Sequence, residues 1–128
     1  MKPDDSRYPD DWYRIGQKEL KRAEILLDAG DLEGAGFNIQ QAVEKYMKGY
    51  LLSKGWNLRK IHDLETLLND SIKYKPLLEK YRESIQRITE YYIIERYPLM
   101  VSSQLTKEEI ITSLKKAVEL IDTIKTPG

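Results

Sequence analysis

The feature that most constrains this chain is a two-residue joint, Gly30-Asp31, between two long segments with helical spacing. In residues 10–29 and 32–53 the apolar side chains recur every three or four positions, as in a helix with one face against a core. Glycine is favoured just after a helix end, and aspartate just before a helix start. Because so short a joint makes two helices antiparallel neighbours, we predict a helical hairpin over residues 10–53, which Gly55 closes. The predicted inward positions are Tyr13, Gly16, Leu20, Ala23 and Leu27, then Ala35, Ile39, Ala42, Tyr46 and Tyr50.

Three further segments have helical spacing. They cover residues 64–69, residues 76–95, and a last helix from residue 107 onward. The start signals of all five helices are Asp10 or Asp11, Asp31, Asp63, Pro76, and a capping box of Thr106 and Glu109. In the helix over 76–95 the predicted inward positions are Leu77, Leu78, Tyr81, Ile85, Ile88 and Tyr92. Pro98 stops that helix, because proline disfavours helix at the residue before it. No segment alternates as a strand does, so the predicted fold is all-α, a four-to-five-helix up-and-down bundle.

Length and composition set the domain organisation. A chain of 128 residues suits one domain, and we expect a flexible N-terminal lead over 1–9 and one helical domain over 10–124. No stretch approaches about 18 uninterrupted apolar residues, and the first residues lack the apolar core of a signal peptide. Because there is also no cysteine, we expect a cytoplasmic protein that does not enter a membrane.

The residue counts exclude several kinds of chemistry. Zero cysteines rule out disulfides, thiolate metal sites and cysteine nucleophiles, and one histidine rules out a histidine-rich metal cluster. The glycines form no phosphate-binding loop and no serine-nucleophile elbow. We therefore expect no metal, no cofactor and no catalytic triad.

The formal net charge of zero conceals an uneven distribution. Residues 1–35 hold six positive and nine negative charges, whereas residues 44–60 hold five positive and one negative. Lys45 and Lys48 in this basic stretch are candidate contacts for a phosphate or an RNA backbone. The alternative is that these cations stabilise the C-terminal end of a helix, where the dipole favours positive charge.

The segment over residues 88–98 is dense in aromatic side chains. Tyr91, Tyr92 and Tyr97 are candidates to stack on a base, and Arg96 is a candidate to pair with a phosphate. The same residues suit core filling or a dimer interface, where tyrosine and arginine are enriched. His62 is a candidate nucleotide contact or acid/base, and its alternative is a structural role at a helix start.

Three runs of residues resemble HEPN (higher eukaryotes and prokaryotes nucleotide-binding) domains. The first run has the pattern of the family's first hairpin, the second that of its next short segment, and the third that of its Arg-Tyr-Pro element. They are Trp12, Ala23, Leu26-Leu27, Gly30-Asp31, Ala35, Phe37, Gln40-Gln41-Ala42, Glu44-Lys45, Lys48, Leu51 and Gly55; His62-Asp63-Leu64 with Leu67-Leu68; and Glu95-Arg96-Tyr97-Pro98. The likeness covers about residues 10–122.

The resemblance implies a helical bundle that commonly forms homodimers. Many small members of the family are encoded beside a minimal nucleotidyltransferase, in toxin–antitoxin or nucleotide-handling pairs. It therefore suggests a non-catalytic, nucleotide-binding interaction module, with Lys45, Lys48, His62 and Arg96 as ligand contacts.

Another branch of the family contains metal-independent RNases with an arginine followed four to six residues later by a histidine. This chain departs from that branch, since no histidine follows Arg96. Arginine stays protonated and cannot act as the base that RNA cleavage needs. Two alternatives stay open: an RNase toxin with a non-standard active site, and a purely structural dimeric adaptor.

Overall fold

The computed structural model describes residues 6–61, 63–97 and 104–127. Its elements are α1 (Pro9–Asp28), α2 (Leu32–Ser53), α3 (Leu64–Ile72), the 3₁₀-helix η2 (Pro76–Tyr81), α4 (Arg82–Arg96) and α5 (Lys107–Lys125). In these ranges all regular structure is helical, which confirms the predicted all-α bundle. None of the described helices is both long enough and apolar enough to cross a membrane.

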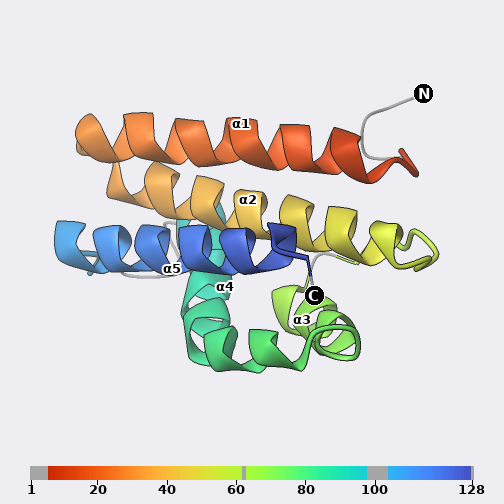
Figure 1. The fold of residues 1–128 in the computed structure, drawn as a ribbon. Coiled ribbons are helices and arrows are strands. Elements are labelled where there is room, and N and C mark those ends of the chain that lie inside the picture. The colour runs from red at the N-terminus through yellow and green to blue at the C-terminus, as the bar shows by residue number, and fades with distance from the viewer. Residues whose placement is uncertain (1–5, 62, 98–103, 128) are drawn as a thin grey trace.

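The first two helices form the predicted antiparallel hairpin (Figure 1). Gly30 has a φ of +84°, in the left-handed region that side chains disfavour. The Asp31 side chain accepts a hydrogen bond from the Gly34 backbone N–H at 2.9 Å, and Gly55 has a φ of +87° after the end of α2. The predicted bounds of the second helix are confirmed at both ends.

The start of α1 differs from the prediction. Tyr8 occupies the N-cap position and Pro9 the first helical position, so Asp10 and Asp11 lie in the first turn rather than at the cap. Asp11 instead accepts a hydrogen bond from the Ser6 hydroxyl at 2.6 Å. Ser6 is buried, and its carbonyl accepts a hydrogen bond from the Trp12 indole at 2.8 Å. These two bonds fasten the residues just before α1 to its first turn.

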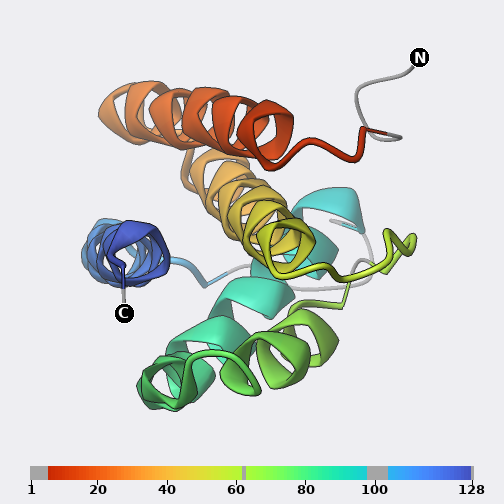
Figure 2. The same cartoon turned by 45° about the vertical axis from the view of Figure 1, so that its right-hand side comes forward.

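Helix α2 is the centre of the bundle and packs against α1, α3, α4 and α5 (Figure 2). Its approach to α1 depends on Gly16, where an added Cβ would lie 2.7 Å from the ring of Tyr46. The same Tyr46 ring stacks on Tyr13, with 5.6 Å between centroids. A small residue on α1 therefore makes room for an aromatic layer between the two helices.

The segment after α3 corrects two predictions. A 3₁₀-helix replaces the first turns of the predicted long helix, and Leu77 within it is exposed rather than inward. In α4 the fully buried aromatic residue is Tyr91, whereas Tyr92 is half-buried. The reason lies on α2, where Gly36 has no side chain and an added Cβ would meet the Tyr91 ring at 2.9 Å. Pro98 lies outside the described residues.

The other predicted helix starts are confirmed. The Asp63 side chain accepts from the Glu65 N–H, and the Thr106 hydroxyl accepts from the Glu109 N–H at 3.1 Å. The helix after Asp63 extends to Ile72, three residues beyond the predicted end. The carboxylate of Glu109, expected to complete a capping box, instead reaches across to α4.

Candidate functional site

The first group of predicted site residues lies in the second half of α2 and is mostly buried. The ammonium groups of Lys45 and Lys48 donate to the same Glu44 oxygen, at 3.1 and 3.2 Å. Both ammonium groups also lie over the buried Trp12 ring, 5.7 and 5.4 Å from its centroid. Lys48 has a side chain only 3% exposed and Lys45 one 16% exposed. Within this chain their charges therefore hold α1 and α2 together, and their role as ligand contacts stays a prediction.

Two glutamines extend this pair into a network along α2. Gln41 donates to Gln40 at 2.6 Å, and Gln40 donates to Glu44 at 3.4 Å. We call Gln40, Gln41, Glu44, Lys45 and Lys48 the Lys48 network. The sequence prediction missed Glu44 as a buried partner, although its spacing of four residues from Lys48 is the spacing of a helical ion pair.

The second group lies at the end of α4 and faces solvent. The Arg96 guanidinium lies over the rings of Phe37 and Tyr92, 5.4 and 5.3 Å from their centroids. Those two rings are in contact, with centroids 5.7 Å apart. The Arg96 side chain is 55% exposed, and its closest described carboxylate is Glu95, 4.0 Å away. Among the described residues, Arg96 makes no hydrogen bond through its guanidinium.

Two exposed apolar side chains adjoin this cluster. Ile93, in the last turn of α4, is 45% exposed, and Tyr97, the C-cap residue of that helix, is 52% exposed. We call Phe37, Tyr92, Ile93, Arg96 and Tyr97 the Arg96 surface. A guanidinium that lies over aromatic rings on a side chain more than half exposed can pair with a phosphate in bidentate geometry.

The structure does not bring all the predicted contacts together within one chain. Phe37 and Lys48 are eleven residues apart on α2, which corresponds to about 16 Å along the helix. The Arg96 surface and the Lys48 network are thus separate. His62 lies outside the described residues. Of the alternatives open for Tyr91, the structure shows core filling, because this side chain is fully buried.

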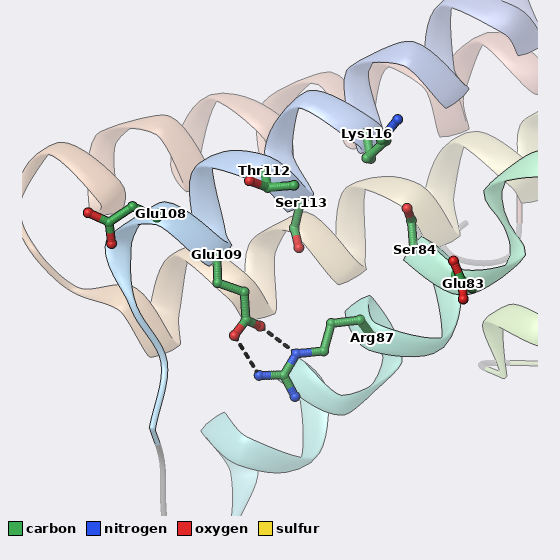
Figure 3. A pocket seen from close by; sticks show the side chains of 8 residues that line it. All are labelled: Glu83, Ser84, Arg87, Glu108, Glu109, Thr112, Ser113 and Lys116. Atoms are coloured by element: carbon green, nitrogen blue, oxygen red, sulfur yellow. Dashed lines mark hydrogen bonds and ion pairs between the residues drawn. The ribbon is translucent and has the colours of Figure 1, made fainter.

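Tyr91 belongs to a third arrangement between α4 and α5 that the sequence did not reveal. Arg87 makes two hydrogen bonds to Glu109, one of them at 2.8 Å (Figure 3). Arg87 makes a further bond to Glu90. Tyr91 donates to Glu109 at 2.7 Å. Since the one phenolic proton is used there, Ser113 is the donor in the 2.7 Å contact between its hydroxyl and Tyr91. We call these five residues the Arg87 network.

The Arg87 network shifts the pKa of its own members. Burial, with Glu109 acting in the same direction, raises the pKa of Tyr91 to about 12. The Arg87 guanidinium holds the pKa of Glu109 below its usual value, and the hydrogen bond to Glu109 raises the pKa of Arg87. All three shifts favour the bonded pattern, so none of these groups is poised to exchange a proton near neutral pH.

A hollow of about 450 Å³ adjoins the Arg87 network (Figure 3). Three carboxylates line it, from Glu83, Glu108 and Glu109, against two cations, from Arg87 and Lys116. An excess of negative charge disfavours a phosphate there. Across the described ranges, no group of three or more His, Cys, Asp or Glu side chains could hold a metal ion. This leaves the Arg96 surface as the stronger candidate site.

Comparison with known protein families shows to which family the helical bundle belongs. The family model of the HEPN domain matches residues 9–126. The chain belongs to the HEPN domain family. That match spans both the Arg96 surface and the Lys48 network, so both are parts of the HEPN domain itself. Neither a curated protein nor a solved structure gives a significant match to this HEPN chain.

Proposed function

We propose that this HEPN-domain protein is a non-catalytic, nucleotide-binding interaction module. The observation that supports it best is the Arg96 surface, where two aromatic rings hold an exposed guanidinium that has no hydrogen bond to a described residue. Arginine recognises phosphate through two parallel N–H donors, and adjacent rings stack on nucleobases. The site therefore offers both halves of nucleotide recognition, a phosphate contact and a stacking platform.

Calorimetric titration with ATP and with GTP tests this function. We expect saturable heat with at least one of them. Absence of heat with both, under conditions where a known nucleotide binder responds, would remove the nucleotide part of the proposal.

The absence of catalysis rests on chemistry at Arg96. Cleavage of RNA by its own 2′-hydroxyl needs a group that accepts a proton and one that donates it. Arg96 stabilises negative charge but stays protonated, and no histidine follows it in the sequence. We expect purified protein to leave RNA intact. Cleavage that persists in a His62→Ala variant would point to the alternative, an RNase with a non-standard base.

The interaction part of the proposal concerns a second copy of the chain. Ile93 and Tyr97 give the end of α4 an exposed apolar rim around Arg96, and tyrosine and arginine are enriched at interfaces. We expect a homodimer in light scattering, and a monomer for Ile93→Lys. Ile25→Lys is the matched control, because Ile25 on α1 is also exposed, at 58%, and lies outside this rim. A dimer that survives Ile93→Lys would place the interface elsewhere.

The proposed protein partner is a separately encoded minimal nucleotidyltransferase, in a toxin–antitoxin-like pair. Membership of the HEPN family supports this pairing. Co-expression with a nucleotidyltransferase from a neighbouring reading frame should yield a complex that co-purifies. Without such a neighbour, the structural adaptor becomes the better hypothesis.

A further inference from the structure

A separate cleft lies between residues at the start of α1, the end of α2 and the end of α5. Its volume is about 260 Å³, and three lysines and three tyrosines are among the side chains that line it. They are Lys54, Lys75, Lys125, Tyr13, Tyr50 and Tyr74. We call it the Tyr50 cleft. Phe37 and Tyr50 are thirteen residues apart on α2, so the cleft lies about 20 Å along that helix from the Arg96 surface.

The charge in the Tyr50 cleft is positive. No carboxylate is among its described lining residues. The C-terminal ends of α2 and α5 also reach this cleft, and each contributes about half a negative charge. Three lysine charges exceed these two half charges, and Asp10, whose charge acts on Tyr13 in the cleft, offsets one more, so a net positive charge of about one remains. Favourable interaction with the two helix ends therefore explains only part of the positive charge of the three lysines.

Lys75 is already engaged in the fold. Its ammonium group donates to the backbone carbonyls of Thr123 and Thr126, at 2.7 and 2.6 Å. Lys54 and Lys125 form no ion pair with a described carboxylate, and both residues are exposed. Their ammonium groups lie over aromatic rings, 5.4 Å from the centroid of Tyr50 for Lys54 and 5.0 Å from that of Tyr46 for Lys125. The ammonium groups of Lys54 and Lys125 are thus held at the cleft without an ion pair to a described carboxylate.

A buried hydroxyl group is the second, independent observation. Tyr50 is 4% exposed, and its hydroxyl is buried without a hydrogen-bond partner among the described residues. Buried polar groups in proteins are nearly always paired. Burial raises the pKa of Tyr50, so this hydroxyl is protonated at neutral pH and is a donor. Neither the packing of the helices nor their ends explain why a hydroxyl donor is buried at this position without a hydrogen bond.

We propose that the Tyr50 cleft binds the phosphoryl group of a small phosphorylated molecule. Lys54 and Lys125 pair with the phosphate charge, and the Tyr50 hydroxyl donates a hydrogen bond to a phosphate oxygen. The hydroxyl is buried, so an incoming oxygen reaches it only after neighbouring side chains move, and exposed lysine side chains reorient within nanoseconds. This site is additional to the nucleotide contact proposed at Arg96.

The test is an NMR titration of the full chain with inorganic phosphate, at ionic strength held constant with sodium chloride. We expect saturable shifts of backbone signals around the Tyr50 cleft. Affinity should fall about tenfold in Tyr50→Phe and at least as much in the Lys54→Ala, Lys125→Ala double variant. Lys115→Ala, a lysine of α5 outside the cleft, should bind phosphate as the wild type does. Shifts that grow linearly without saturation, or equal affinity in all variants, would overturn the proposal.

Two further measurements make the outcome specific. Tyr50→Phe should keep the wild-type melting temperature, because the lost hydroxyl has no hydrogen-bond partner among the described residues. Weaker binding could then not be ascribed to unfolding. Adenosine monophosphate should shift the signals around the Tyr50 cleft and adenosine should not, whereas equal shifts there with both would contradict recognition of a phosphoryl group. Arg96→Ala should leave phosphate binding unchanged. Loss of binding in that variant alone would assign phosphate to the Arg96 surface and refute the cleft without touching the proposed function.

Discussion

The two arginines at the middle and end of α4 have contrasting surroundings. Arg87 makes two hydrogen bonds to Glu109 and one to Glu90, and its guanidinium lies 5.3 Å from the centroid of the Tyr91 ring. Arg96 has aromatic contacts of the same length but no hydrogen bond to a described residue. The difference separates two uses of one side chain. An arginine with three hydrogen bonds to carboxylates stabilises the fold, and one whose described contacts are with aromatic rings keeps its donors for a ligand.

The largest effect should come from the most deeply buried charge pair, in the Lys48 network. Glu44→Gln removes the buried carboxylate that accepts hydrogen bonds from both Lys45 and Lys48, and we expect a loss of about 3 kcal/mol in the free energy of unfolding. Urea denaturation measures it. The matched control is Glu19→Gln, whose ion pair with Arg22 at 2.8 Å is largely exposed on the arginine side and should cost under about 0.5 kcal/mol. Equal losses for the two variants would show that pairing in the Lys48 network does not hold the hairpin together.

The second-largest effect should be a loss of folding stability at alkaline pH. The pKa of Tyr91 is about 12 in the folded chain and about 10 when unfolded, so the folded state holds the proton more tightly. This contribution to stability is complete below pH 10 and is lost as the pH rises from 10 to 12. It amounts to about 2.5 kcal/mol. The decline in urea midpoint over that range should be shallower in Tyr91→Phe. An unchanged decline would mean that burial does not raise the pKa of Tyr91 in the folded chain.

The third-largest effect should come from removing Arg87, the arginine that is hydrogen-bonded to Glu109 and Glu90. Arg87→Ala removes the paired hydrogen bonds to Glu109 and leaves the Tyr91 hydroxyl bond in place, for an expected loss of about 2 kcal/mol. The melting temperature should fall by several degrees. A wild-type melting temperature in Arg87→Ala would remove the contrast between the two arginines of α4.

The smallest effect on stability should come from Arg96. Arg96→Ala removes an exposed side chain with no hydrogen bond to a described residue, and we expect a change under about 0.5 kcal/mol. Arg22→Ala, with a side chain 61% exposed on α1, serves as control for the loss of one surface arginine. A loss of 2 kcal/mol or more at Arg96 would make this arginine a second structural residue.

The hairpin shows why part of the fold follows from the sequence. The joint at Gly30 and Asp31 and the bounds of α2 depend on local signals, which are a glycine with positive φ and a side-chain cap. The start of α1 escaped prediction because Ser6, which lies outside any helical pattern, binds Asp11 and takes it away from capping. The orientation of Tyr91 depends on Gly36, a residue more than fifty positions away on another helix.

The residues of the candidate site also divide into those predicted from the sequence and those that only the packing of helices reveals. Arg96, Tyr92 and Tyr97 were predicted together because they are close in sequence, and they do lie at one end of α4. Phe37 joins them only through packing of α2 against α4. The bond between Arg87 and Glu109 and the hydroxyl of Tyr50 could not be predicted, because pairing between helices leaves no periodic pattern in the chain.

The most direct test of the contrast between the two arginines measures melting temperature and nucleotide affinity together in Arg87→Ala and Arg96→Ala. We predict that Arg96→Ala keeps the wild-type melting temperature and loses at least about tenfold in affinity for ATP or GTP, from the loss of a charged hydrogen bond. Arg87→Ala should melt lower and, while folded, bind with wild-type affinity. Wild-type nucleotide affinity in Arg96→Ala would contradict the assignment of the binding site to the end of α4.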